Sequence, residues 1–366
     1  MALRLFFLLL ILAAGSSPAS AQRSLDRKIG QMILVGFRGM EAGPDSLIAQ
    51  QIRRFHLGGV VLFDYDVEWR KYKRNVRSPQ QLRSLTAQLQ AASRTPLFIA
   101  IDQEGGLVNR LKPEYGFPPT LTADTLGKID RLDTTAARAA AIAHTLRDMG
   151  INLNFAPDVD LDTCPVPDSS IIHVRKRSFG KKPDKVTAHA RAFVRAHRQQ
   201  RVLTALKHFP GHGSAKGDTH GGFVDVTHVW KAAELEPFRR LIESGDCDMI
   251  MTAHIFNAWL DPLHPATLSK RVLSGILREE YRYKGVIITD DMQMGAIAKE
   301  FGLERAMELA VNAGADILLF GSNMQHDPRI AETAFFTLKK LVREGKISKK
   351  QVRQSYRRIR ALKKKM

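Results

Sequence analysis

The segment LTALKHF (Leu203–Phe209), followed by PGHG (Pro210–Gly213), joins an apolar run to a loop rich in ionisable side chains. The first part of the run is apolar on both faces, as in a strand buried within a parallel sheet. Pro210 and the two glycines that follow end the strand and begin a loop. The segment therefore predicts a buried parallel strand with Lys207 and His208 at its carboxyl end.

Eight runs of this kind occur along the chain, and longer stretches with helical spacing separate them. The runs are Met32–Phe37, Gly59–Phe63, Leu97–Asp102, Asn152–Pro157, Leu203–Phe209, Met249–His254, Val286–Asp290 and Ala315–Phe320. Helical spacing is clearest in Pro79–Ala92, Thr134–Met149, Leu235–Ser244 and Glu304–Ala313. The alternation predicts an α/β fold, a single (β/α)8 TIM-like barrel with its active site at the C-terminal ends of the strands. The alternative is an open doubly wound sheet, but neither G-x-G-x-x-G after the first run nor G-x-x-x-x-G-K-[ST] anywhere supports it.

Polar side chains stand at or just beyond the ends of five of these runs. They are Asp102, Asp158, Lys207, His208, His254 and Asp290. In a barrel all these ends face one mouth, so the pattern indicates an enzyme. Asp290 and Asp291 are adjacent in a strand and point to opposite faces, so one should enter the mouth and the other should face or cap a helix.

The loop after the fifth run continues to Asp218 and His220. Two residues apart on an extended loop, their side chains can touch. A carboxylate fixes the tautomer of an imidazole and raises its basicity, which is how a general acid/base is built. The alternative is a metal-dependent hydrolase, with ligands drawn from His208, His212, His220, His254 and Asp290. No H-E-x-x-H or H-x-H spacing supports that alternative, so neither a metal nor another cofactor is predicted.

Residues 1–21 have the pattern of an export signal. Arg4 precedes the apolar run Leu5–Ala14, and an A-x-A site follows at Ala19–Ala21. A membrane-spanning helix needs about 20 apolar residues, so the run is too short, although an uncleaved anchor is an alternative. We predict a signal peptide at 1–21, one domain over 22–366, and an exported protein, periplasmic or secreted. Cys164 and Cys247 fall at opposite faces of a barrel, so we expect two free thiols.

The chain carries 56 Lys and Arg against 37 Asp and Glu, a formal charge of +19. Thirteen of these basic residues, with the single acid Glu344, lie in the last 28 residues. Ser348 is expected to cap a closing helix that packs on the barrel through Val352, Ser355, Ile359 and Leu362. The basic face is either simply solvated or attracted to an anionic wall or membrane surface. Nucleic acid is not expected, because no known binding module is present.

Four stretches resemble the glycoside hydrolase family 3 β-N-acetylglucosaminidases, β-N-acetylhexosaminidases of the peptidoglycan-recycling type. They are IDQEGG (Ile101–Gly106), RSFG (Arg177–Gly180), KHFPGHG (Lys207–Gly213) with DTH (Asp218–His220) beyond it, and TDDM (Thr289–Met292). The similarity runs from Ile29 to about Leu362, and the KHFPGHG block with its D-x-H is highly specific. The resemblance implies a single (β/α)8 catalytic domain acting on cell-wall glycan fragments.

The resemblance further implies a retaining enzyme that removes non-reducing terminal N-acetylglucosamine from β-linked glycans through a covalent glycosyl-enzyme. Asp290 matches the nucleophile, His220 the general acid/base, and Asp218 the acid that orients it. The positions that hold the sugar are matched by Asp102, Arg110, Arg177, Lys207 and His208. Phosphorolysis in place of hydrolysis stays open, as does a non-catalytic glycan-binding wall protein.

Two loops depart from the family pattern. Asp64–Arg77 is longer and more basic than the family's second loop, and Leu161–Lys176 is also unusual. Leu107 and Asn109 stand where the family often has Arg and Gln, whereas Arg110 is retained. The two loops are expected to line the rim of the mouth, so they bear on the group beyond the first sugar.

Overall fold

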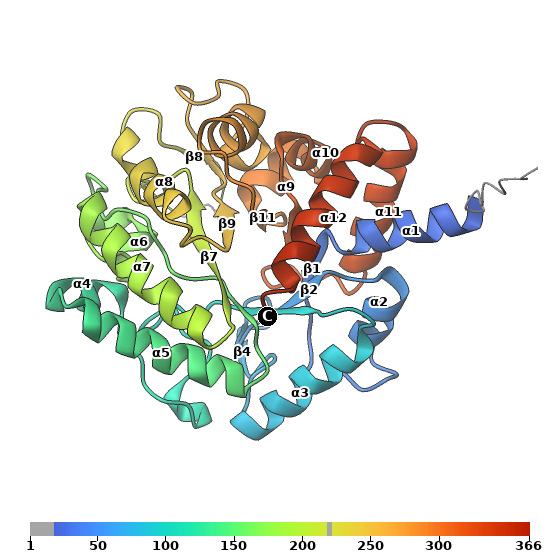
Figure 1. Cartoon of the computed structure of the whole chain (residues 1–366), viewed down its shortest axis with the longest axis horizontal. Coiled ribbons are helices and arrows are strands. Elements are labelled where there is room, and N and C mark those ends of the chain that lie inside the picture. Colours follow the sequence, from blue (N-terminus) through green and yellow to red (C-terminus); the bar gives the residue numbers. More distant parts are fainter. Residues whose placement is uncertain (1–17, 218–221) are drawn as a thin grey trace, which may run out of the picture.

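The computed structural model describes residues 18–217 and 222–366, and its centre is a closed barrel of eight parallel strands (Figure 1). The order around the barrel is β1 (Ile33–Gly36), β12 (Ile317–Phe320), β11 (Val286–Asp291), β9 (Met249–Thr252), β7 (Leu203–Phe209), β6 (Leu153–Asn154), β5 (Phe98–Ile101) and β2 (Gly59–Leu62). The barrel closes where β12, the last strand in the chain, pairs with β1, the first, with Ile33 opposite Leu318. All eight predicted runs form strands of the barrel, so the predicted (β/α)8 fold is confirmed.

Helices surround the barrel as an outer ring (Figure 1). They are α1 (Pro18–Gly30), α2 (Leu47–Phe55), α3 (Pro79–Ala92), α4 (Ala123–Ile129), α5 (Leu132–Asp148), α6 (Ile171–Val174), α7 (Pro183–Gln199), α8 (Glu236–Glu243), η5 (Arg271–Glu280), α9 (Gly295–Phe301), α10 (Leu303–Ala313), α11 (Ile330–Arg343) and α12 (Lys349–Lys363). Single helical turns occur at Pro113–Tyr115 (η1), Pro167–Ser169 (η2), Ala232–Leu235 (η3) and Ala266–Leu268 (η4).

Helix α3 illustrates how local sequence sets these elements. Ser78 caps it by accepting a hydrogen bond from the backbone N–H of Gln81, and Pro79 takes the first turn, where its missing N–H costs nothing. Leu82, Leu85 and Leu89 then fall on one face and are buried.

The basic C-terminal helix α12 lies across one end of the barrel (Figure 1). Ser348 caps it through the backbone N–H of Gln351. The four residues expected to pack on the barrel are all buried: Val352, Ser355, Ile359 and Leu362. Both cysteines are free thiols, as expected.

Two small sheets lie outside the barrel. β3 (Tyr65–Asp66) and β4 (Lys71–Tyr72) form an antiparallel hairpin within the unusual loop after β2, and β8 (Val224–Asp225) pairs with β10 (Ile255–Phe256). Across residues 18–217 and 222–366, none of the helices has the length and apolar character that crossing a membrane requires. Most of the predicted signal peptide, residues 1–17, lies outside the described residues.

Candidate active site

A cavity of about 520 Å³ opens at the C-terminal ends of the barrel strands. Its lining includes six of the eight residues predicted for the site: Asp102, Arg110, Arg177, Lys207, His208 and Asp290. The other two, Asp218 and His220, lie outside the described residues. The loop that leads to them follows β7, at the same mouth.

Lys207 is the buried cation at the centre of this cavity. Its side chain is 2% exposed, and its Nζ lies 2.9 Å from Asp102 Oδ1 and 2.7 Å from Glu104 Oε1. Burial alone would lower the pKa of Lys207, but these two carboxylates raise it overall. Burial likewise opposes ionisation of Asp102 and Glu104, yet the pKa of each stays low because of the cations beside it, chiefly Lys207 for Asp102 and Arg177 for Glu104. At neutral pH the three groups are therefore ionised and can hydrogen-bond to the polar groups of a ligand.

Arg177 joins two parts of the mouth. It donates from Nε and Nη2 to the Glu104 carboxylate, at 2.9 and 2.7 Å, in a bidentate pair. Its Nε also lies 3.2 Å from Asp158 Oδ2, and its Nη2 donates to His208 Nε2 at 3.3 Å. Although burial opposes its charge, these carboxylates raise the pKa of Arg177, so its planar guanidinium is a fixed cation in the wall.

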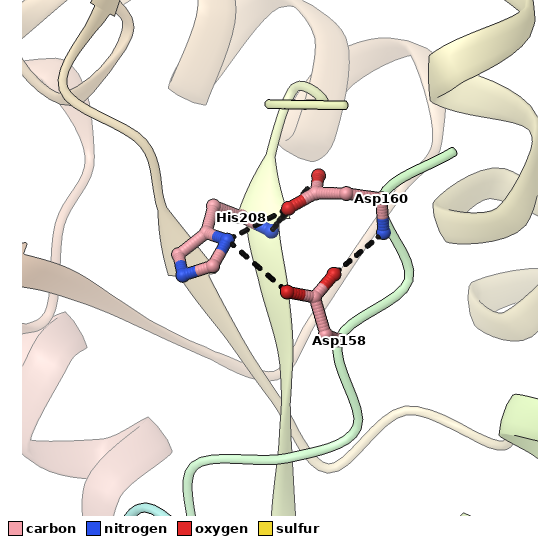
Figure 2. Close-up of side chains that lie close together, drawn as sticks. All are labelled: Asp158, Asp160 and His208. Atoms are coloured by element: carbon pink, nitrogen blue, oxygen red, sulfur yellow. Dashed lines mark hydrogen bonds and ion pairs between the residues drawn. The ribbon is translucent and has the colours of Figure 1, made fainter. Parts of the chain in front are cut away.

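His208 is oriented by Asp160, as Figure 2 shows. Because His208 Nε2 accepts from Arg177, its Nδ1 carries the proton and donates to Asp160 Oδ2 at 2.7 Å. Asp160 also accepts the backbone N–H of His212 at 2.7 Å, and these bonds lower its pKa despite its burial. Burial and the neighbouring Asp160 instead raise the pKa of Asp158. At neutral pH Asp160 is therefore ionised, whereas the pKa of Asp158 lies above the usual range of a carboxyl group.

The predicted metal alternative is not assembled by the described residues. Among them, the cluster that could share a metal ion is Asp158, Asp160 and His208, whose ligand atoms lie within 4.8 Å of one another. It contains neither His212, His254 nor Asp290. Arg177 and the His208 ring proton already contact its oxygens, so a metal ion would have to displace both.

The structure distinguishes the two adjacent acids at the end of β11. The Asp291 carboxylate accepts the backbone N–H groups of Gly321 at 2.9 Å and Gln293 at 3.0 Å, so it ties β11 to the loop after β12. The Asp290 carboxylate accepts the N–H of Asp291 at 2.8 Å, and Asp290 is part of the cavity lining. Both acids line the cavity, and Asp291 in addition holds the loop after β12 in place.

The loop that carries Asp102, Glu104 and Arg110 is held by neutral amides. Asn154 of β6 accepts the N–H of Gln103 and donates to its carbonyl oxygen, both at 3.0 Å. Gln103 Oε1 in turn accepts the N–H of Arg110 at 2.9 Å. Arg110 is then placed with its Nη2 3.6 Å from Asp102 Oδ2.

The roles of four residues of this site were not predicted from the sequence: Gln103, Glu104, Asp160, and Asp158 as the neighbour of Asp160. Glu104 lies two positions after Asp102, and Asp160 two after Asp158. Side chains two apart in extended chain point to the same face, so this spacing was the available signal. Their partners, Arg177 and His208, come from other strands and loops, which spacing does not reveal.

Glu234 is a buried acid beneath the loop after β7. Its Oε2 accepts the N–H groups of Gly213 at 3.0 Å and Ser214 at 3.3 Å, and the residue is 1% exposed. Burial raises its pKa from 4.5 to about 7, and the nearby Asp160 acts in the same direction. Glu234 therefore changes charge close to neutral pH while holding the backbone beside His212.

We expect Glu234→Gln to flatten the pH dependence of stability. A folded-state pKa above the unfolded value means that this group favours folding most below about pH 4.5, and that its contribution is lost as the pH rises through 7. The difference is on the order of 3 kcal/mol. Thermal and urea unfolding of both proteins from pH 4.5 to 8 would measure it. The exposed Glu279→Gln is the control, and parallel curves for wild type and Glu234→Gln would contradict the expectation.

A barrel mouth lined by fixed cations, low-pKa carboxylates and an aspartate at a strand end defines a barrel enzyme for a polar substrate. Comparison with known proteins gives the family. The Glycosyl hydrolase family 3 N terminal domain model matches residues 24–362, and the chain belongs to this family.

Similar proteins include Beta-hexosaminidase A of Pseudoalteromonas piscicida, 33% identical over 97% of this chain and 64% of that protein. Among solved structures, a glycoside hydrolase family 3 β-N-acetylglucosaminidase from Paenibacillus sp. is 35% identical, with a TM-score of 0.83 over 93% of this chain and 62% of that one. The β-N-acetylhexosaminidase from Beutenbergia cavernae is 28% identical, with a TM-score of 0.82 over 93% and 98%. The chain thus spans less than two thirds of the first two proteins.

Proposed function

We propose that this protein is a retaining β-N-acetylhexosaminidase that hydrolyses terminal N-acetylglucosamine from β-linked glycans. The observation that carries the proposal is the gathering of Asp290 and all five sugar-matching residues in one cavity. The names of similar proteins, β-hexosaminidase and β-N-acetylglucosaminidase, agree with it.

In this mechanism the ionised floor of the cavity holds the sugar. Asp102 and Glu104 accept hydrogen bonds from hydroxyl groups, and Lys207 and Arg177 donate to them. Asp290 attacks the anomeric carbon to form a glycosyl-enzyme, while His220, oriented by Asp218, protonates the leaving oxygen. His220 then takes a proton from a water molecule as the water oxygen attacks the anomeric carbon, and the bond from this carbon to Asp290 breaks, which releases the sugar and restores the carboxylate.

The decisive experiment is release of p-nitrophenol from its β-N-acetylglucosaminide, beside the β-glucoside, with and without EDTA. Chelator-resistant release from the first substrate only supports the proposal. Loss of activity in EDTA would favour the metal-dependent hydrolase, and no release from either substrate would favour a glycan-binding protein. Repeating the assay in phosphate, with analysis for a sugar 1-phosphate, separates phosphorolysis from hydrolysis.

We expect His220→Ala to slow the hydrolysis of alkyl glycosides by roughly 10²–10⁴-fold and that of activated aryl glycosides far less. Nitrophenolate leaves without a proton, whereas an alkoxide needs one, so only the second reaction depends on an acid. Steady-state kinetics on both substrates measure this difference. Equal losses on both would remove His220 from the acid role.

The proposal extends to location and partner. The short apolar run and A-x-A site at the N-terminus support export, and an exported enzyme would act on wall-derived glycan during peptidoglycan turnover. The surplus of basic residues in the C-terminal segment supports electrostatic contact with an anionic wall or membrane surface. Sedimentation with anionic vesicles tests this contact, and no retention at low salt would contradict it.

A further inference from the structure

The outer edge of the cavity carries exposed apolar side chains, in contrast to its charged floor. Three of its lining side chains are large, apolar and exposed: Val67 (40%), Leu107 (53%) and Met324 (38%). They come from the loops after β2, β5 and β12, which lie on one side of the barrel. Single exposed apolar residues are ordinary, but three around one opening mark a binding surface.

The cavity is larger than one sugar requires. At roughly 30 Å³ per molecule of liquid water, its volume of about 520 Å³ corresponds to about 17 waters. One N-acetylhexosamine has fewer non-hydrogen atoms than this number of water molecules. Covalently bonded atoms also lie closer together than neighbouring water molecules, so the sugar fills less than the whole cavity. A sugar bound to Lys207 and Glu104 on the buried floor therefore leaves room toward the rim, where its leaving group must pass.

The hairpin β3–β4 holds this rim in place. Asp66 accepts from Arg38 at 2.7 Å and from the buried Arg74 at 2.8 Å, and Arg74 also donates to the carbonyl of Ser322 at 2.7 Å. The N–H of Val67 donates to Asn323 Oδ1 at 3.2 Å. The loops after β2 and β12 are thus joined, so a ligand at the rim meets a surface that is already ordered.

Tyr65, from the same hairpin, extends the apolar surface into the cavity. It lines the cavity, and its ring packs against Tyr72 with centroids 4.8 Å apart. Pyranose rings present C–H groups on their faces, which pack on aromatic and aliphatic side chains. On the same rim the exposed Arg175 offers hydrogen-bond donors to hydroxyl oxygens.

We propose that Tyr65, Val67, Leu107 and Met324 form a leaving-group subsite that binds the second sugar ring of a β-linked oligosaccharide. The proposal rests on the glycosidase function proposed above, and it makes these residues determinants of specificity. It also gives a task to the longer loop at 64–77, which supplies Tyr65 and Val67.

The test compares two substrates with alkyl leaving groups, the β-1,4-linked N-acetylglucosamine dimer and methyl β-N-acetylglucosaminide. Only the dimer carries a second ring. In Leu107→Ser and in Val67→Ser/Met324→Ser, the ratio of kcat/KM for dimer over methyl glycoside is expected to fall about tenfold. Leu107→Met should restore most of the ratio, because it returns apolar surface. Leu263→Ser, at an apolar residue 75% exposed outside the cavity lining, is the control and should leave both values unchanged.

Each outcome bears on one proposal or both. An unchanged ratio in both variants, with wild type active on both substrates, would overturn the subsite and leave the glycosidase function standing. An equal loss on both substrates would also overturn it, since the rim would then act on the first sugar. A wild-type protein that cleaves neither substrate nor the aryl glycoside would overturn both.

Discussion

Asp290→Ala is expected to abolish turnover, with kcat reduced on the order of 10⁴-fold or more. The carboxylate is the proposed nucleophile, and alanine leaves no group that can form the glycosyl-enzyme. The cations and carboxylates of the floor are unchanged in this variant, so substrate should still bind. Stopped assays with p-nitrophenyl β-N-acetylglucosaminide, together with a direct binding measurement using N-acetylglucosamine, separate the two effects.

The matched control is Asp291→Asn, which changes the adjacent acid. Its carboxylate accepts the N–H groups of Gly321 and Gln293, so we expect a lower melting temperature and a much smaller loss of kcat. The opposite pattern, with Asp291→Asn inactive and Asp290→Ala active, would transfer the nucleophile to Asp291. Labelling with a fluorinated glycosyl donor and peptide mass spectrometry gives an independent answer, because the adduct identifies the attacking oxygen.

The same labelling tests whether a side chain acts as the nucleophile. Some hexosaminidases use the acetamido group of their own substrate as the nucleophile, and these form no adduct with a side chain. A label on Asp290 would exclude that route here. If no residue is labelled while the enzyme is active, the covalent mechanism proposed for Asp290 is wrong.

The barrel could be predicted because its strands are buried on both faces. Runs such as Phe98–Ile101 contain only apolar residues. This pattern can be recognised in the sequence without knowing which strands lie beside the run in the barrel. The helix cap at Ser348 could also be predicted from the adjacent sequence alone, and the structure confirms it. By contrast, the hairpin Tyr65–Tyr72 was not predicted, since two strands of two residues each contain too little periodicity to detect.

The site residues also fall into those that local sequence predicts and those that depend on a distant partner. Lys207 and His208 were found because they stand near the end of β7, and Asp290 because it stands near the end of β11. The roles of Glu104 and Asp160 were missed because each is defined by a partner from elsewhere, Arg177 for one and His208 for the other. The separate surroundings of Asp290 and Asp291 could not be predicted from sequence, since those of Asp291 depend on the backbone N–H groups of Gly321, after β12, and Gln293.

Lys207→Met is expected to cost stability and activity together. Lys207 lies within 3 Å of both Asp102 and Glu104, and its removal leaves two buried carboxylates with less compensation. Breaking a buried ion pair from one side typically costs about 3–5 kcal/mol of unfolding free energy. We also expect kcat/KM to fall by at least about 10²-fold, because the sugar-binding floor loses its central donor. Urea unfolding and steady-state kinetics measure the two losses.

The other buried lysine of the described chain provides the control for Lys207. Lys363 donates to Gln31 Oε1 at 2.8 Å and to the carbonyl of Gly58 at 2.7 Å, with no carboxylate in contact, and burial lowers its pKa to about 7. Lys363→Met should therefore cost less stability and leave kcat/KM unchanged. In the double variant Lys207→Met/Glu104→Gln, one of the two carboxylates left without the lysine is replaced by a neutral amide. Part of the lost unfolding free energy should therefore return, whereas kcat/KM should stay low. If activity returned as well, charge balance rather than sugar binding would be the role of Lys207.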